Sequence, residues 1–468
     1  MIAVTLPAMS STQPGATAAP NDPPVDQSLL RRTVAASMAG TVVEWYDFFL
    51  YATASALVFA KVIMPATGNA YDAIIAAFVT YAIGFVARPL GGVVFGHIGD
   101  RLGRKYTLQL TIMLIGVATV LMGCLPTYDQ IGLLAPIALV VLRFVQGLAL
   151  GGEWGGAVLL VAEHAPDDRR ATWAAWPQAA VPVGNLLATL VLTLMTITLS
   201  DAAFLSWGWR VAFWLSAVVV VVGYYIRRSV SDSPIFEEAK AEQGEAASAG
   251  YGVFEVVRRY PLGVLKGMGL RFAENIMYYL VVSFSIVYLV EDQKMDQGAL
   301  LGLIAVAHAC HFFFILAVGR LADGVGRMPV YLVGAVLGAT WGFWAFPMLD
   351  TRNNVAIVAA LIAGLAIHAL MYSTQPAIMA EMFPTRMRYS GISISYQVTS
   401  IFAGSLAPLL AIAWLKDTGT WTNTAIYLAV AGIITGLVVL TLKETKGTSL
   451  RALDRADADR TEREVSPA

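Results

Sequence analysis

Long apolar blocks alternate with short polar segments along most of the chain. Twelve of these blocks are long enough to cross a bilayer as a helix, which takes about 20 residues. The blocks are continuous, so they favour helices over the alternating strands of a barrel. The predicted spans are 34–60, 73–95, 106–124, 133–161, 172–199, 209–226, 264–290, 300–318, 329–348, 355–380, 392–415 and 421–442. The pattern predicts an all-α polytopic membrane protein with twelve transmembrane helices.

The chain divides into two related halves. The motif Gly96-His-Ile-Gly-Asp100-Arg-Leu-Gly103-Arg104 recurs as Gly319-Arg-Leu-Ala-Asp323-Gly-Val-Gly326-Arg327, each time after the second span of a half. Glu163-His-Ala-Pro166 recurs as Glu381-Met-Phe-Pro384. We therefore expect two pseudo-symmetric six-helix bundles with a substrate site where they meet. The expected parts are a disordered N-terminal tail (1–30), a first bundle (31–228), a central loop (229–262), a second bundle (263–443) and a C-terminal tail (444–468).

Composition and charge place this chain in a membrane. Hydrophobic residues make up 57% of the chain and charged residues 13%, against roughly 25% charged residues in soluble domains. Of the 31 Lys and Arg residues, 23 fall in the tails and in the loops on the same side as the tails. The positive-inside rule then predicts a multi-pass protein of the cell (inner or plasma) membrane, with both tails and the central loop in the cytoplasm. The basic residues form no nucleic-acid patch, and two cysteines in different halves indicate packing, not a disulfide.

Several motifs resemble those of one transporter family. Gly91-Gly-Val-Val-Phe-Gly-His-Ile-Gly-Asp-Arg-Leu-Gly-Arg-Lys105 resembles the major facilitator signature between the second and third spans. Further motifs resemble the metabolite:proton symporter family of that superfamily: Gly40-Thr-Val-Val-Glu-Trp-Tyr-Asp-Phe-Phe-Leu-Tyr51, Arg88-Pro-Leu-Gly-Gly, Arg143-Phe-Val-Gln-Gly147, Gly151-Gly-Glu-Trp-Gly-Gly156, Phe204-Leu-Ser-Trp-Gly-Trp-Arg210 and Ser233-Pro-Ile-Phe236. The resemblance implies a proton-coupled symporter that imports a small organic acid or zwitterion, such as shikimate or a dicarboxylate, by alternating access. A proline/glycine-betaine osmolyte symporter is the alternative within the same family.

Two carboxylates on the first span are candidates for carrying the coupled proton. Glu44, Asp47 and Tyr51 share one helical face, because they lie three and seven residues apart. Ionisable groups inside a membrane span are costly, so a functional role is the default interpretation. Glu44 or Asp47 either binds the proton or forms a fixed ion pair with Arg88 or Arg143, and the sequence leaves both possibilities open.

Other polar residues inside the spans are candidates for binding the substrate. A buried arginine offers a forked donor to a carboxylate, which favours an anionic or zwitterionic substrate. Single Gln or Asn residues also bond neighbouring helices to each other, so clustering on one face is the stronger indication. The predicted substrate-binding residues are Tyr51, Arg88, Arg143, Gln146, Glu153, Gln178, Arg271, Glu274, Asn275, Tyr278, His368 and Gln375. His308 and His311 lack the further ligands of a metal site, which favours packing or a modest role in proton transfer.

The repeated loop motif predicts a gate at the cytoplasmic end. Asp100 is expected to face the positive N-terminal end of a helix from the other half, and Arg104 to pair with Glu163. Exposed ion pairs contribute little, so a gate needs a partly buried network that breaks on opening. The predicted gate residues are Gly96, Asp100, Arg101, Gly103, Arg104, Glu163, Asp323, Arg327 and Glu381.

Competing classes of function find less support in the sequence. No Gly-Lys dipeptide of a phosphate loop occurs, which disfavours ATP-driven transport, and neither His-Glu-x-x-His nor Gly-x-Ser-x-Gly is present to indicate an enzyme. A channel does not require the duplicated gate motifs, and a membrane nutrient sensor usually carries an added soluble module. The expected partners are therefore a small-molecule substrate, protons and the lipid bilayer. We expect no nucleic acid, no metal and no cofactor, and a functional monomer.

Overall fold

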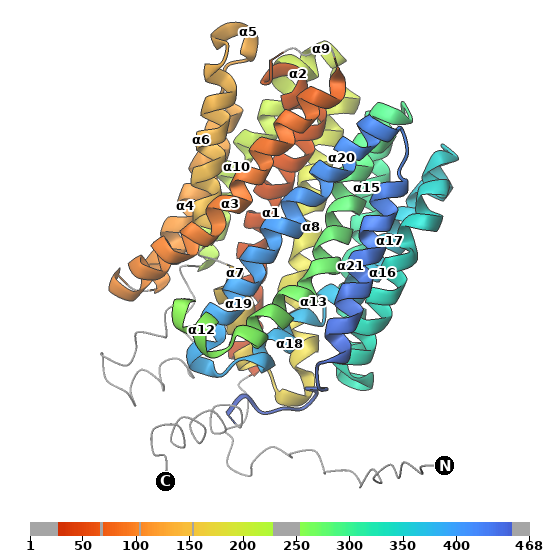
Figure 1. Ribbon diagram of the computed structural model, residues 1–468. Coiled ribbons are helices and arrows are strands. Elements are labelled where there is room, and N and C mark those ends of the chain that lie inside the picture. The colour runs from red at the N-terminus through yellow and green to blue at the C-terminus, as the bar shows by residue number, and fades with distance from the viewer. Residues whose placement is uncertain (1–26, 66–68, 103, 152–153, 228–252, 452–468) are drawn as a thin grey trace, which may run out of the picture.

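The computed structural model describes residues 27–65, 69–102, 104–151, 154–227 and 253–451, and within these ranges all regular structure is helical (Figure 1). Eleven helices of the described chain are long and apolar enough to cross a membrane. The shorter apolar helix Gln109–Gly123 supplies the twelfth span. The prediction of an all-α membrane protein with twelve spans is confirmed.

The first six spans come from the first half of the chain. Their helices are α1 (Gln27–Ala54) with η1 (Ser55–Phe59) and α2 (Ala60–Val62), α3 (Ala70–Leu102), α4 (Arg104–Gly123), α6 (Leu134–Gly151) with α7 (Trp154–His164), α8 (Arg170–Thr198), and α9 (Asp201–Ala203) with η3 (Phe204–Gly208) and α10 (Trp209–Arg227). The short helices α5 (Tyr128–Ile131) and η2 (Asp167–Arg169) lie in loops. Residues 27–30, predicted as tail, instead begin α1, and most of this helix is buried.

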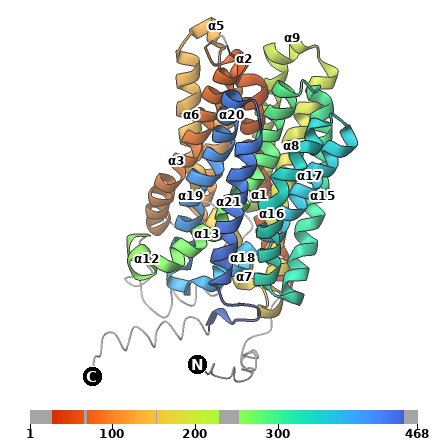
Figure 2. The ribbon, with the colours of Figure 1, turned by 45° about the vertical axis from the view of Figure 1, so that its right-hand side comes forward.

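The second six spans follow the same order. Their helices are α13 (Pro261–Tyr279) with η4 (Leu280–Phe284), α14 (Ser285–Val287) and η5 (Tyr288–Asp292), α15 (Gln297–Val325), α16 (Arg327–Asp350), α17 (Asn354–Tyr372) with α18 (Gln375–Met382), α19 (Thr385–Thr399) with η6 (Ser400–Ser405) and α20 (Leu406–Thr418), and α21 (Thr422–Leu440). We call the end where α1 begins and α21 ends the terminal face. Part of the predicted central loop forms α12 (Val253–Arg259), which lies at the terminal face beside α13 and α19 (Figures 1 and 2).

The two halves meet along paired helices. α15 of the second half packs along α8 of the first, and α20 packs against α3. Segments of π-helix interrupt the first, seventh and eleventh spans at η1, η4 and η6. Such single turns widen a helix locally and occur often at functional sites. Here η4 directly follows the part of α13 that carries the predicted binding residues.

Glycines bring α3 and α6 into backbone contact. A Cβ atom added at Gly151 would lie 1.9 Å from the backbone oxygen of Arg88, and one at Gly147 would lie 2.2 Å from that of Gly84. Only a residue without a side chain allows this approach, as in other close membrane helix pairs. The close contact places Arg88 of α3 beside Arg143 of α6.

We expect Gly151→Ala to destabilise the fold by about 1–3 kcal/mol, because α3 and α6 must separate to admit the methyl group. Thermal unfolding of the purified protein in detergent measures the loss. Gly436→Ala on α21 is the matched control, since its Cβ would meet only Leu332 Cδ1, at an ordinary 3.7 Å. Equal unfolding temperatures for the two variants would show that the close contact between α3 and α6 does not determine the stability of the fold.

Candidate functional site

A chain of buried polar side chains connects Asp47 with Arg143 in the first half. Asp47 on α1 accepts hydrogen bonds from Ser216 Oγ on α10 (2.5 Å to Oδ1) and from Thr119 Oγ1 on α4 (3.0 Å to Oδ2). Gln146 Nε2 donates to Thr119 Oγ1 at 2.8 Å, and Arg143 Nη1 donates to Gln146 Oε1. Among the described residues no ion pair joins Asp47 to an arginine, so the carboxylate and the guanidinium are linked only through two neutral groups.

Arg143 lies among aromatic rings at the centre of the first half. Its Cζ is 4.2 Å from the ring centre of Tyr51, and 4.9 Å from those of Phe48 and Tyr81. Stacking of this kind holds a guanidinium without neutralising its charge. The Nε and Nη2 atoms of Arg143 are buried and have no hydrogen-bond partner among the described residues. Arg143 therefore retains free donors for an anion.

Arg88 contacts the same aromatic group. Its Cζ is 4.6 Å from the ring centre of Phe48 and 4.7 Å from that of Phe85, and its Nε has no hydrogen-bond partner in the part of the chain that the structure describes. A forked guanidinium with open N–H groups matches the geometry of a carboxylate. Arg88 and Arg143 thus place two positive charges around Phe48.

The second half holds a more fully paired network. Arg271 Nη1 on α13 lies 3.3 Å from both Glu274 Oε2 and Gln375 Oε1, and its Nη2 donates to Ser400 Oγ at 3.2 Å. Gln375 Nε2 donates to Glu274 Oε2 at 3.3 Å, and His368 Nε2 lies 2.9 Å from Glu274 Oε1. Glu274 offsets the charge of Arg271, so this cluster is less suited than Arg88 and Arg143 to binding an anion.

Aromatic contacts join the two halves between these networks. Tyr279 of the second half lies with its ring centre 5.7 Å from that of Phe85 and 6.2 Å from that of Phe48. Gln178 of α8 also crosses between the halves, because its Nε2 donates to the backbone oxygen of Tyr372 at 3.1 Å. The site therefore consists of two polar networks on either side of an aromatic layer.

The structure brings most of the predicted site residues into these networks. Glu44 is buried on α1, as are Asn275 and Tyr278 on α13, and no described group forms a hydrogen bond with Asn275 Oδ1. Glu153 lies outside the described residues. Thr119, Ser216 and Ser400 were missed, because an isolated Ser or Thr in an apolar span is common and carries no distinguishing signal. Within the described residues no group of three or more His, Cys, Asp or Glu is arranged to hold a metal ion.

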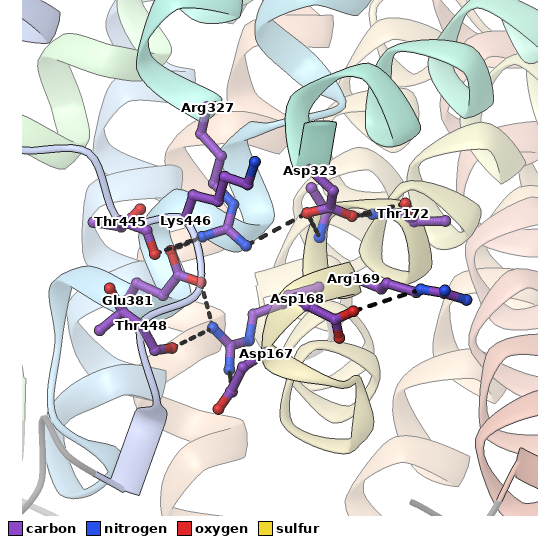
Figure 3. Close-up of polar contacts among 12 residues, drawn as sticks. Asp167, Asp168, Arg169, Thr172, Asp323, Arg327, Glu381, Thr445, Lys446 and Thr448 are labelled. Atoms are coloured by element: carbon purple, nitrogen blue, oxygen red, sulfur yellow. Dashed lines mark hydrogen bonds and ion pairs between the residues drawn. The ribbon is translucent and has the colours of Figure 1, made fainter. Parts of the chain in front are cut away.

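At the terminal face, Glu381 lies between two buried arginines from different halves (Figure 3). Arg170 of α8 donates through Nη1 to Glu381 Oε1, and Arg327 of α16 donates through Nη1 to Glu381 Oε2. The side chains of all three are at most 1% exposed. The carboxylate therefore binds the first half to the second inside the protein.

Two further contacts cross the halves at this face. Arg388 Nη1 of α19 lies 3.1 Å from Glu163 Oε1 of α7. Asp323 of α15 accepts hydrogen bonds from the backbone N–H groups of Ala171 (3.1 Å) and Thr172 (2.7 Å), and so caps α8 of the other half. A carboxylate at a helix N-terminus is stabilised by the helix dipole. These contacts hold the terminal face closed.

The segment after α21 adds to this closure. Glu444 accepts hydrogen bonds from the backbone N–H groups of Arg327 (3.1 Å) and Met328 (3.0 Å), at the start of α16. The backbone oxygen of Thr448 accepts from Arg170 Nη1 at 3.0 Å. Arg170, Arg388 and Glu444 were not predicted as gate residues. The repeat of Arg170 as Arg388 after the Glu-x-x-Pro motif was the available signal.

The gate motif of the first half lies where little is described. Gly96, Asp100, Arg101 and Arg104 fall in α3 and α4, but their side chains are outside the described part, and Gly103 lies outside it altogether. At the opposite face, Lys416 of α20 pairs with Asp72 of α3 at 2.5 Å, and both side chains are at least one-third exposed. An exposed pair is weak beside the buried network of the terminal face.

Comparisons with known proteins agree with this architecture. The family model for sugar (and other) transporters matches residues 32–456. The shikimate transporter of Escherichia coli (strain K12) is 37% identical over 430 residues, which cover 91% of this chain and 98% of that protein. The proline/betaine transporter of the same organism is 32% identical over 452 residues, which cover 93% of this chain and 88% of that protein.

The fold is also that of a solved transporter. The proton:xylose symporter XylE, bound to 6-bromo-6-deoxy-D-glucose, aligns with a TM-score of 0.73 over 91% of this chain and 99% of that chain, at 16% identity. Such low identity shows a shared fold and no more. Together with the family match, it confirms the predicted resemblance to the metabolite transporters of the major facilitator superfamily. The chain belongs to the sugar (and other) transporter family of that superfamily, and is a multi-pass membrane transporter of small molecules, not an enzyme.

Proposed function

We propose that this protein imports a small organic acid together with protons, across a bacterial inner membrane, by alternating access. The terminal face is cytoplasmic in this proposal, because the loops on that side carry most of the Lys and Arg residues. The observation that carries the proposal is a pair of buried arginines with open donors, connected to a buried carboxylate through neutral side chains.

The substrate carboxylate binds to Arg88 and Arg143 in this mechanism. Both guanidiniums lie inside the bundle, where charge–charge interactions are stronger than in water. Arg271 is already paired with Glu274 and serves to orient that carboxylate and Gln375. Tyr278, Asn275 and Gln178 then contact the rest of the substrate across the boundary between the halves.

Asp47 carries the coupled proton, and Glu44 on the same helix assists it. Arg143 reaches Asp47 through Gln146 and Thr119, so an anion bound to Arg143 changes the electric field at the carboxylate. The substrate-bound carrier is favoured when Asp47 is protonated. When the substrate leaves, the charge of Arg143 is no longer offset by an anion, and it favours the ionised form of Asp47. Proton and substrate therefore bind and leave together.

The terminal-face network is the cytoplasmic gate. The exposed pair between Lys416 and Asp72 opens at lower cost than the buried contacts around Glu381, so substrate enters from the opposite face. Opening to the cytoplasm breaks the contacts of Glu381 with Arg170 and of Asp323 with α8. One chain holds both halves and the whole site, so we propose that the monomer is functional.

A proline/glycine-betaine osmolyte symporter is the alternative. The similarity to a proline/betaine transporter supports it, since a zwitterion also offers a carboxylate to Arg88 and Arg143. The two proposals differ in the group at the other end of the substrate, which is a hydroxyl or second carboxylate in one case and a cationic amine in the other.

Uptake into proteoliposomes tests the proposal. We expect labelled shikimate, or another acid from a panel of shikimate, 2-oxoglutarate and citrate, to accumulate when an acid-outside gradient is imposed. A potential of about 100 mV supplies about 2.3 kcal/mol per charge, and each pH unit about 1.4, which supports accumulation of roughly tens- to hundreds-fold. An uncoupler should abolish it. Gradient-driven uptake of proline or glycine betaine alone would favour the alternative, and no gradient-stimulated uptake would refute proton symport.

A further inference from the structure

Three buried histidines lie together in the second half. His308 and His311 come from α15 and His368 comes from α17, and each is at most 1% exposed. The ring centre of His311 lies 5.1 Å from that of His368 and 6.3 Å from that of His308. Tyr278 of α13 completes the group, with its ring centre 4.7 Å from that of His368. The mechanism proposed above makes no use of His308 or His311.

Hydrogen bonds determine which nitrogens of this group carry protons. Glu274 pairs with Arg271 and therefore accepts at Oε1 from His368 Nε2, at 2.9 Å. Neutral His368 then has a bare Nδ1, which accepts from His311 Nε2 at 3.1 Å. In neutral His311 the remaining nitrogen, Nδ1, is consequently an acceptor. This Nδ1 is buried, and no described residue forms a hydrogen bond with it.

His308 adds a second set of unpartnered atoms. Both of its ring nitrogens are buried, and neither has a hydrogen-bond partner within the described ranges of the chain. A neutral imidazole has one donor and one acceptor, so His308 and His311 together offer two acceptors and one donor. Buried polar groups in proteins are nearly always satisfied, so their concentration here indicates a place where a bound molecule forms hydrogen bonds.

This group of histidines lies near the boundary between the halves. Tyr278 lies 6.1 Å from His311 and 6.5 Å from His308, measured between ring centres, and 5.5 Å from Phe49 of the first half. Phe49 follows Phe48, whose ring is stacked by both Arg88 and Arg143. A substrate with its carboxylate at these arginines therefore has its other end directed towards the second half.

The pattern of donors and acceptors selects a chemical class. A hydroxyl group both donates and accepts, and so satisfies an imidazole nitrogen of either kind. A second carboxylate only accepts and would leave both acceptors unsatisfied. The quaternary ammonium of glycine betaine has no N–H at all. We infer that His308 and His311 form a subsite for hydroxyl groups of the transported acid, an inference that rests on the proposed function.

Two substitutions of His311 separate the subsite from the hydrogen-bonded chain. Gln places its amide near the position of imidazole Nε2, so His311→Gln retains a donor for His368 and loses the acceptor at Nδ1. Asn places its amide near the position of Nδ1, so His311→Asn retains an acceptor there. His308→Leu removes both nitrogens of the second histidine. His164→Gln is the control, because His164 lies at the terminal face and contacts Leu160 O.

The readout is the preference for shikimate over cyclohex-1-ene-1-carboxylate, which lacks the three hydroxyls. Binding of both acids is measured by titration of the purified protein in detergent, after gel filtration and thermal unfolding have shown that each variant is folded. We expect the wild type and His164→Gln to prefer shikimate by at least about tenfold. His311→Gln and His308→Leu should each reduce the preference about threefold to tenfold, which corresponds to one hydrogen bond. His311→Asn should keep most of it.

The outcomes distinguish this inference from the transport function. An undiminished preference in His311→Gln and His308→Leu overturns the inference and leaves the symporter intact, as does a wild type that binds both acids equally. If one His311 variant does not fold, the shikimate preference of His308→Leu still tests the inference. A wild type that binds neither acid but binds glycine betaine overturns both the inference and the proposed substrate class.

Discussion

Replacing Glu381 with Gln should shift the protein strongly towards a state open at the terminal face. The substitution keeps the shape of the side chain but leaves Arg170 and Arg327 buried without the carboxylate that they share. Breaking a buried pair by removing one partner costs about 3–5 kcal/mol. We therefore expect the ratio of open to closed protein to rise by roughly 10²-fold to 5 × 10³-fold, with slower net transport because the closed state is no longer favoured.

Thiol labelling measures this shift. With Cys124 and Cys310 replaced, a cysteine introduced at Ala175, which is buried against Gly319 of α15 one turn further along α8 than the network, should react with a membrane-impermeant maleimide much faster in Glu381→Gln than in the wild type. Asp168→Asn is the control, since Asp168 and Arg169 form a pair whose side chains are 76% and 70% exposed. Equal labelling rates in Glu381→Gln and the control would contradict the assignment of Glu381 to the gate.

The arrangement of spans could be predicted from the sequence because membrane burial leaves a local signal. Continuous apolar blocks specify helices whatever they pack against, so all twelve spans were found, although some of their ends lie up to about eight residues from those predicted. The repeat of Asp100 as Asp323 and of Glu163 as Glu381 similarly indicated charged residues at one end of both halves.

The partners of those charges could not be predicted in the same way. Glu381 meets Arg170, which is 211 positions away, and no local pattern encodes a contact of that length. Arg170 and Arg388 were counted as loop charges, but both are buried in the first turn of a helix, Arg170 in α8 and Arg388 in α19. The segment around Glu444 is polar and was assigned to a tail, although its backbone oxygens and one carboxylate contact the arginines and the start of α16.

The helix pair α8 and α15 connects the gate with the centre of the molecule. At the terminal face Asp323 of α15 caps α8, and further along the same helices Gln178 of α8 contacts Tyr372 and His311 of α15 contacts His368. Both helices are long and pack along each other. Separating them at the terminal face therefore also changes how α8 packs against α15 near the centre of the molecule. Alternating access in this protein is consistent with rocking of the halves about that pair.

Asp47→Asn should abolish proton-driven accumulation and spare exchange of substrate. The amide keeps an oxygen that accepts from Thr119 or Ser216, so the fold is retained, but it cannot bind and release the coupled proton. Accumulation of labelled shikimate under an acid-outside gradient should fall from roughly tens-fold or more to the level of equilibration. Exchange of external label against internal unlabelled substrate should stay within about threefold of the wild type, because Arg88 and Arg143 are unchanged.

Two further variants make this result specific. Asp201→Asn removes an exposed carboxylate at the start of α9, outside the proposed mechanism, and should accumulate substrate as the wild type does. Glu44→Gln tests the neighbouring carboxylate: if it alone loses accumulation while Asp47→Asn retains it, Glu44 carries the proton. If both variants accumulate normally, neither carboxylate couples the cycle. Asp47 would then be a structural acceptor that fixes α4 and α10 to α1 through Thr119 and Ser216, and the link from Arg143 would position these helices without coupling the substrate to a proton.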